Sequence, residues 1–137
     1  MSIIYKTGNE IQSDQLLALY NDAGWQAYTS SPETLQKAVS NSLFVLTAWE
    51  DEKLVGLLRM IGDGLTIIYI QDILVLKSHQ RRGIGKELIN RTFEKFRSVR
   101  QKVLLTDNTP ETLAFYKNTG FKNVNDLELS AFIRIEK

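Results

Sequence analysis

The sequence predicts a mixed α and β fold in which helices cover a single sheet. Three observations predict it. The hydrophobic period alternates between helical and strand-like stretches along the chain. Residues 65–76 form a long apolar run rich in β-branched side chains, which is typical of a central strand covered on both faces. A glycine-rich loop then joins this run to an amphipathic segment at 84–97.

The first half of the chain alternates helical and extended patterns. Ser13 can cap a helix that Gly24 ends, and Pro32 suits the first turn of the next helix. Charged residues 50–53 and the Gly62-Asp63-Gly64 stretch are turn signals between apolar runs. These signals predict a strand at 2–6, helices at 14–23 and from residue 32, and strands at 43–49, 54–61 and 65–76.

The second half continues the same alternation. Apolar side chains recur with a helical period over 84–97, and Thr109 and Pro110 open a further helix that ends at Gly120. We therefore predict helices in both places, a strand at 102–106, and closing strands at 121–124 and 129–135.

Composition bounds the class of protein. The chain has 137 residues, of which 43% are hydrophobic, so we expect one domain over residues 1–137 with a sizeable core. The 17 basic and 16 acidic side chains nearly cancel, which argues against a nucleic-acid partner. The absence of cysteine excludes disulfides, Cys-based zinc sites and a cysteine nucleophile.

Targeting signals and metal sites are not expected. Residues 1–9 lack an apolar leader segment, and no stretch approaches the ~20 apolar residues that cross a membrane. We expect a cytoplasmic protein without a membrane partner. His79 is the single histidine, which we expect at the surface, and one histidine cannot build a His-rich metal site.

The stretch Gln80-Arg81-Arg82-Gly83-Ile84-Gly85-Lys86 carries the chemistry. Glycines permit a tight turn whose N–H groups converge at a helix start, and the helix dipole and three basic side chains add positive charge. Such a loop suits a pyrophosphate. A Walker A loop is excluded because Glu87 follows Lys86, and a dinucleotide fingerprint is excluded by Leu88. A solvated glycine turn remains the alternative.

The stretch also resembles the cofactor loop of the GNAT acetyltransferases, whose pattern Q/R-x-x-G-x-G/A it matches at Gln80, Gly83 and Gly85. The strand Ile70-Gln71-Asp72-Ile73-Leu74-Val75-Leu76 before it is similar to the family's central strand. Downstream, Asn108, Ala114-Phe115-Tyr116 and Gly120-Phe121 resemble its second conserved region. The Gly62-Asp63-Gly64 turn resembles the corresponding turn in one branch of the family, which includes arylalkylamine-type acetyltransferases.

The resemblance implies an α-β-α sandwich with a mostly antiparallel sheet, a splayed central strand pair and about four helices. It also implies that acetyl-CoA is the acetyl donor and that the pantetheine arm pairs beside the central strand. The cofactor contacts implied are Ile73, Leu74, Val75, Gln80, Arg81, Arg82, Gly83, Ile84, Gly85, Lys86 and Asn108. One N–H of 73–75 would polarise the thioester carbonyl. For the oligomeric state, the resemblance to the family suggests a homodimer, and the sequence itself does not indicate one.

The resemblance implies that Tyr116 is the general acid toward the departing thiolate. Several relatives place Glu or His at the position of Gln71, and glutamine cannot act as a base. We therefore expect a water-mediated base, with Asp72 as the adjacent candidate. On a regular strand Asp72 would face away from Gln71, whereas a β-bulge would turn it inward. A carboxylate paired with a neighbouring element is the alternative.

The acceptor side is expected to draw on Trp25, Tyr28, Tyr69 and Gln71, with Tyr20, Asp22 and Phe132 as further candidates. Aromatic rings beside an acidic group could hold an ammonium group, but for any single one of these residues ordinary packing is the favoured explanation. Without a cysteine, and without a serine in a G-x-S-x-G setting, direct transfer is favoured over an acetyl-enzyme. Three functions stay open: a small-molecule amine acetyltransferase, a protein lysine or N-terminal acetyltransferase, and a non-catalytic acyl-CoA-binding module.

Overall fold

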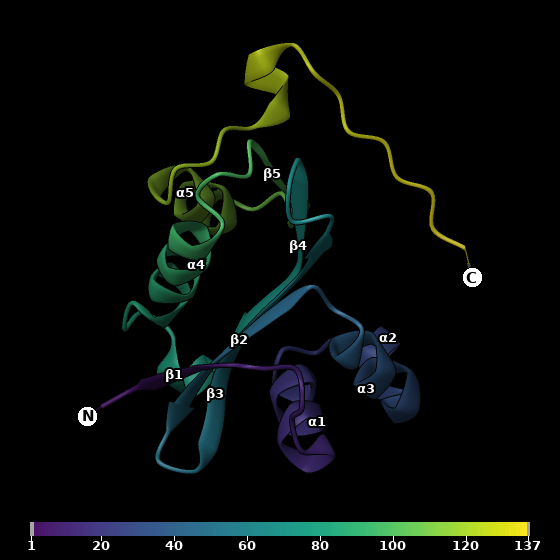
Figure 1. The fold of residues 1–137 in the computed structure, drawn as a ribbon, viewed down its shortest axis with the longest axis vertical. Coiled ribbons are helices and arrows are strands. Elements are labelled where there is room, and N and C mark those ends of the chain that lie inside the picture. The colour runs from purple at the N-terminus through teal and green to yellow at the C-terminus, as the bar shows by residue number, and fades with distance from the viewer. Residues whose placement is uncertain (1, 137) are drawn as a thin grey trace. The chain divides into compact units, whose positions relative to one another are not determined.

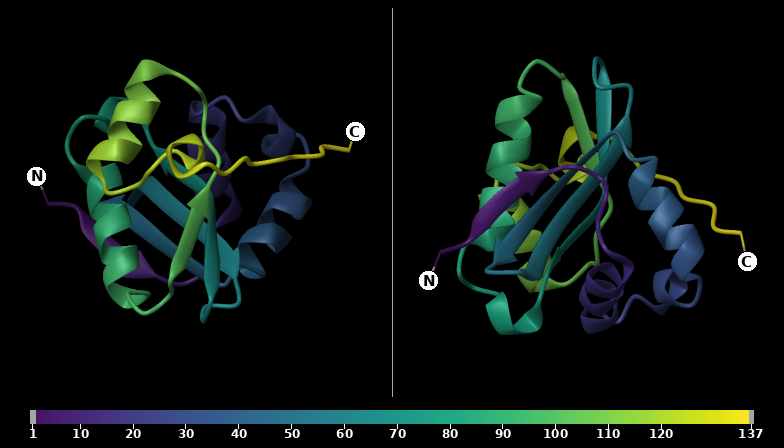
Figure 2. Two further views of the ribbon diagram at one scale, coloured as in Figure 1. Left: turned by 90° about the horizontal axis from the view of Figure 1, so that it is seen from above. Right: turned by 60° about the horizontal axis from the view of Figure 1, so that its bottom comes forward.

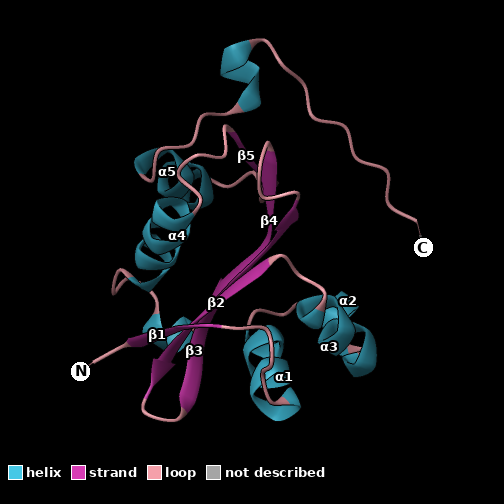
Figure 3. Ribbon diagram, viewed as in Figure 1, coloured by secondary structure: helices cyan, strands magenta, loops and turns pink. Residues whose placement is uncertain are grey.

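A computed structural model describes residues 2–136, which fall into two compact units, one ending at Leu105 and the other beginning at Thr106. Figure 1 labels the elements and Figure 3 colours them by type. The elements of the first unit are β1 (Ile4–Thr7), α1 (Ser13–Asp22), α2 (Gln26–Thr29), α3 (Pro32–Ser40), β2 (Phe44–Glu50), β3 (Lys53–Gly62), β4 (Ile67–Val75), a 3-10 turn (Lys77–His79), α4 (Ile84–Lys95) and β5 (Gln101–Leu104).

The first unit is built on one five-stranded sheet with the order β1-β2-β3-β4-β5. The first four strands are antiparallel, and β5 pairs parallel to β4. The parallel pair needs a crossover connection, which α4 supplies between β4 and β5. The predicted strands of this unit are confirmed, with bounds that differ by one or two residues.

Helices cover both faces of this sheet, as the right-hand view in Figure 2 shows, with α4 on one face and α1 to α3 on the other. On the α4 face, a Cβ at Gly56 would lie 3.2 Å from the Ile84 side chain and 3.3 Å from that of Ala48. The missing side chain therefore lets the start of α4 approach the sheet closely. On the opposite face, Leu16, Leu19 and Tyr20 of α1 are fully buried, and this burial drives the packing.

The turn between β3 and β4 is held by Asp63. Its Oδ1 accepts hydrogen bonds from the N–H groups of Leu65, Thr66 and Ile67, and its Oδ2 accepts one from the Thr66 hydroxyl. These bonds hold the pKa of Asp63 well below its usual value. At Gly62, φ is 138° and a Cβ would lie 2.4 Å from the Ile67 carbonyl oxygen, so only glycine fits this corner.

The second unit contains α5 (Pro110–Asn118) and a 3-10 turn (Val124–Leu127). The predicted helix is confirmed: Thr109 is its N-cap, accepting a hydrogen bond from the Thr112 N–H, and Pro110 occupies its first turn. Gly120 follows the helix with a φ of 100°, as a glycine beyond a helix C-terminus should.

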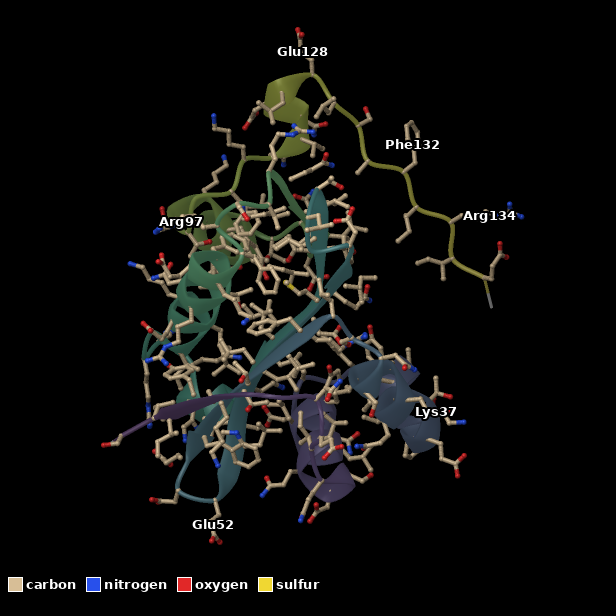
Figure 4. All side chains as sticks on the ribbon, in the orientation of Figure 1. Lys37, Glu52, Arg97, Glu128, Phe132 and Arg134 are labelled. Atoms are coloured by element: carbon tan, nitrogen blue, oxygen red, sulfur yellow. The ribbon has the colours of Figure 1, made fainter. Side chains whose placement is uncertain are left out.

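The two closing strands predicted at 121–124 and 129–135 are wrong for the described residues. Residues 121–123 and 128–136 have no regular secondary structure. Phe132 is 94% exposed, and Figure 4 shows Phe132 and Arg134 projecting from an extended segment. A strand requires a hydrogen-bonded neighbour, and no backbone hydrogen bond of residues 130–136 occurs within the described part of the chain.

Candidate active site

The glycine-rich loop leads from the 3-10 turn into α4, as predicted. Gly83 is the N-cap of α4 with a φ of 83°, and Arg81 also has a positive φ of 65°. Gly83 adopts this left-handed conformation without strain, whereas a residue with a side chain, such as Arg81, does so at some cost. Alternating signs of φ turn successive N–H groups toward one side, which is the geometry of an anion-binding nest.

The N–H groups of residues 81–86 are free to bind a ligand. Among residues 2–136, none of them donates a hydrogen bond to a carbonyl or a side chain. A Cβ placed at Gly83 would meet nothing within 4 Å, so the space above the turn is open. A row of unpaired amides at the start of a 12-residue helix fits the diphosphate of a coenzyme.

Basic side chains flank these amides. Arg81, Arg82 and Lys86 are exposed. In the described chain the single ion pair among them joins Arg82 Nη1 to Glu50 Oε2 at 3.9 Å. Gln80, the first residue of the loop, donates from Nε2 to the Val75 carbonyl at 3.2 Å. The loop therefore presents positive charge to solvent while its first side chain is tied back to β4.

One edge of β4 lacks a strand neighbour over its second half. β5 pairs with β4 only from Ile67 to Ile70, whereas the pairing of β3 with β4 extends from Ile68 to Val75. The backbone from Gln71 to Val75 thus has an edge that no strand of residues 2–136 covers. Ile73, Leu74 and Val75, the predicted contacts of an extended ligand arm, lie in this stretch, directly before the loop. An extended chain can add to such an edge by backbone hydrogen bonds.

A β-bulge lies where Gln71 is found. Arg59 pairs with Asp72 and Met60 pairs with Ile70, so Gln71 is the extra residue of β4. The bulge reverses the alternation of side chains, and Gln71 and Asp72 consequently point to the same side of the sheet. Both contact the Tyr28 hydroxyl, which donates to Asp72 Oδ1 at 3.1 Å and accepts from Gln71 Nε2 at 2.9 Å.

Asp72 is buried and paired. It is 2% exposed, and its Oδ2 accepts hydrogen bonds from Arg59 Nε at 2.8 Å and from the Tyr20 hydroxyl at 2.7 Å. Taking up a proton would break a buried ion pair that satisfies both charges. The geometry therefore favours the pairing alternative for Asp72, and a direct catalytic role for it stays a prediction.

Aromatic residues gather around this ion pair. The rings of Tyr20, Trp25 and Tyr28 lie with centroids 5.3 to 6.0 Å apart. Burial raises the pKa of both tyrosines that bind Asp72, so their hydroxyls stay protonated. Trp25 and Tyr28 are half-buried and Gln71 is exposed. The structure thus brings together four of the predicted acceptor-side residues: Tyr20, Trp25, Tyr28 and Gln71.

Tyr69 lies on β4, two residues before the bulge, and is also half-buried. Burial raises its pKa, while a hydrogen bond to the Leu105 backbone opposes the rise. The remaining two candidates are Asp22 of the first unit and Phe132 of the second. Asp22 binds the Lys77 N–H through its carboxylate, and Phe132 lies in the exposed extended segment.

Tyr116 and Asn108 belong to the second unit. Tyr116 lies on α5, and its ring packs edge-on against Phe115 and Phe121 with centroids 5.0 and 5.6 Å away. Burial raises the pKa of Tyr116 to about 12, with a hydrogen bond to Thr106 lowering it and the charge of Asp107 raising it. The phenol is therefore protonated at neutral pH. Asn108 is exposed.

The family model of the acetyltransferase (GNAT) domain matches residues 9–135. The chain belongs to the GNAT acetyltransferase family. The match includes the open edge of β4, the glycine-rich loop and α5.

Relatives of known sequence or structure are similar to this GNAT chain over most of its length. A GNAT family acetyltransferase from Streptococcus pneumoniae is 31% identical, with a TM-score of 0.87 and 99% of each chain covered. A Glycine max protein named histone acetyltransferase TAP1 is 28% identical over 88% of this chain and 56% of its own length. An aminoglycoside acetyltransferase from a soil metagenomic sample, in complex with sisomicin, is 22% identical with a TM-score of 0.71, covers 98% of this chain and 97% of its own, and shows the fold alone.

The chain spans about half the length of the first curated relatives that it matches. Within residues 2–136 of this GNAT chain, no helix has the length and apolar character needed to cross a membrane. Nor do three or more His, Asp or Glu side chains of this part gather as metal ligands would.

Two features of this GNAT site were missed by sequence reasoning. Arg59 forms the buried ion pair with Asp72. His79, expected at the surface, is 6% exposed and bonds to Glu50 and Ser78. That expectation is wrong, because the 3-10 turn folds the imidazole in against the end of β2. A signal existed for Arg59, since one arginine in an otherwise apolar strand pattern needs a buried partner.

Proposed function

We propose that this GNAT enzyme transfers the acetyl group of acetyl-CoA directly to a primary amine of a small molecule. The row of unpaired N–H groups at residues 81–86, immediately after an open strand edge, is the observation that carries the proposal. It supports a ligand with a diphosphate at one end and an extended amide-bearing arm at the other. Coenzyme A has this construction, and the thioester of acetyl-CoA supplies the activated acetyl group.

The donor side uses backbone groups. The N–H groups of residues 81–86 would hold the diphosphate, with Arg81, Arg82 and Lys86 adding charge. The free edge at Ile73–Val75 would pair with the pantetheine arm, and one N–H there would donate to the thioester carbonyl. Asn108 of the second unit is a further proposed contact. We also assign both units to one acetyltransferase domain, because the family match runs across the boundary at Leu105.

Tyr116 is the proposed acid toward the departing thiolate. With a pKa of about 12, the phenol is a weaker acid than a thiol of ordinary pKa near 8.5. Complete proton transfer to the free thiolate is therefore uphill, and the phenol contributes chiefly a hydrogen bond to the sulfur as charge develops there. The thiolate can then receive its proton from water or from the amine.

The acceptor must lose a proton before or during attack. Asp72 is held by Arg59, and Gln71 has no basic group, so we propose that water takes this proton. The amine then reacts from its unprotonated fraction, which rises as pH increases toward the amine pKa.

For an alkylamine with a pKa near 10, kcat/KM is expected to rise about tenfold per pH unit below that pKa. The measurement is kcat/KM against pH for two acceptors whose pKa values differ. The rising part of the profile of kcat/KM against pH should shift to higher pH for the amine with the higher pKa. A limb that stays at one pH for both amines would instead reveal a titrating base on the protein.

Small-molecule and protein acceptors are separated by assay. The solved aminoglycoside acetyltransferases share the fold, whereas the Glycine max relative is named a histone acetyltransferase, which keeps a protein acceptor as the second candidate. A thiol-release assay with a panel of amines and lysine peptides tests the proposal. Turnover concentrated in one class of small amine supports it. Turnover with peptides alone would contradict it.

A further inference from the structure

His79 is a buried polar side chain whose two ring nitrogens are both hydrogen-bonded. Nε2 lies 3.0 Å from Glu50 Oε1, and Nδ1 lies 2.7 Å from the Ser78 hydroxyl. A carboxylate only accepts hydrogen bonds, so Nε2 carries the proton that is shared with Glu50. Burial of such a group requires satisfied partners, and these contacts provide them.

Glu50 connects two different parts of the chain. It is the last residue of β2, and it binds His79 through Oε1 while Oε2 lies 3.9 Å from Arg82 Nη1. Oε2 is buried and accepts no hydrogen bond from the described residues. One carboxylate thus touches the residue before the glycine-rich loop and a residue within it. The hydrogen bond from His79 and the charges of Arg82 and Lys53 lower the pKa of Glu50.

The loop between His79 and α4 needs such an anchor. Residues 80–83 form no helix or strand, and Arg81 is held at a φ of 65°. On the far side of the loop, Ile84 is 2% exposed and fixes the start of α4 to the core. On the near side, His79 is the buried residue. Two buried residues therefore hold a four-residue loop between them.

We infer that Glu50 and His79 are positioning residues that fix the glycine-rich loop in the conformation that binds the coenzyme diphosphate. This inference rests on the proposed function. We call the pair, with Arg82 as its third member, the Glu50 clasp. Without the clasp, the backbone of residues 80–83 would have to become ordered when the ligand binds. The free-energy cost of this ordering would weaken the binding.

If the clasp positions the loop, breaking it should lower the affinity only for ligands that carry the diphosphate. Ligands that carry the diphosphate should bind more weakly when the clasp is broken, whereas an acyl donor that lacks it should be unaffected. A role confined to general stability would lower performance with both kinds of donor. Selectivity between donors therefore separates a positioning role from a merely structural one.

The variants are Glu50→Ala, the conservative Glu50→Gln, and His79→Gln. Glu52→Ala is the matched control, because Glu52 is an exposed acidic residue of the turn that follows β2, and its side chain makes no hydrogen bond or ion pair in the described structure. Calorimetry measures the dissociation constants of coenzyme A and of dephospho-coenzyme A, which keeps the diphosphate. Steady-state assays compare acetyl-CoA with S-acetylpantetheine, which lacks the diphosphate.

Glu50→Ala is expected to weaken binding of both diphosphate ligands about tenfold. KM for acetyl-CoA should rise with kcat unchanged, and kcat/KM for S-acetylpantetheine should equal that of the unsubstituted protein. Glu50→Gln keeps an acceptor for His79 and should restore part of the affinity. Glu52→Ala should change nothing. His79→Gln removes the imidazole from the same contact and should show the same selectivity as Glu50→Ala.

Two results would overturn the inference: equal coenzyme A affinity in Glu50→Ala and Glu52→Ala, or an equal loss with S-acetylpantetheine. If Glu50→Ala does not fold, His79→Gln provides the same two comparisons. These failures differ from failure of the proposed function. In the latter case the unsubstituted protein itself takes up no coenzyme A, and the clasp assignment falls with it.

Discussion

Replacing Tyr116 by phenylalanine is expected to lower kcat about 100-fold at saturating acetyl-CoA. The substitution removes only the hydroxyl, and the ring contacts with Phe115 and Phe121 remain. The lost interaction forms as the thiolate departs, so the effect belongs to the transition state and not to binding of the donor. Steady-state kinetics give kcat, and calorimetry gives the dissociation constant of acetyl-CoA, which should not change.

The matched control is Tyr5→Phe, which removes a hydroxyl from a tyrosine of β1 whose ring lies 4.3 Å from the Arg91 guanidinium carbon. This variant should retain full turnover. An unchanged kcat in Tyr116→Phe would contradict the assignment of the acid. Undiminished coenzyme binding by a protein that has no turnover with any amine or peptide would favour the non-catalytic binding module.

Replacing Asp72 by asparagine is expected to lower the free energy of unfolding by about 3 kcal/mol. The change leaves the Arg59 guanidinium charged, with its side chain 7% exposed, and without its counter-ion. It also weakens the hydrogen bonds from Tyr20 and Tyr28. The loss comes from an uncompensated buried charge, and not from the intrinsic strength of the ion pair. Urea unfolding measures the change directly.

Glu94→Gln provides the comparison for this prediction. Glu94 pairs with Arg97 at 3.1 Å, but both side chains are more than 70% exposed. Breaking that pair should cost less than about 1 kcal/mol. A loss of similar size in both variants would contradict the account of Asp72 as a buried structural carboxylate.

The centre of the fold could be predicted from the sequence because local signals agree with the tertiary structure there. The apolar run at 65–76 became β4, and the glycines of the loop stand where the backbone turns into α4. The bulge at Gln71 was foreseen only as an alternative. Register depends on both strands of a pair, and one strand pattern alone cannot show that Arg59 pairs with Asp72 while Met60 pairs with Ile70.

Other parts depend on contacts that no local pattern contains. Residues 129–135 have strand-like composition, but composition supplies no hydrogen-bonding partner. His79 is one residue from an exposed glutamine, and its burial follows from the position of Glu50, 29 residues earlier. Arg59 and Asp72 carried a usable signal: two opposite charges in two consecutive apolar strands predict a buried ion pair.

The most direct test is a calorimetric titration of the folded chain with acetyl-CoA, repeated at higher salt concentration. We expect saturable uptake of one equivalent, weakened by salt because Arg81, Arg82 and Lys86 contribute charge at the diphosphate. Competition by free coenzyme A, and none by a simple acetate salt, should accompany it. No heat of binding from a chain that circular dichroism shows to be folded would contradict the claim that residues 80–86 hold an acyl carrier.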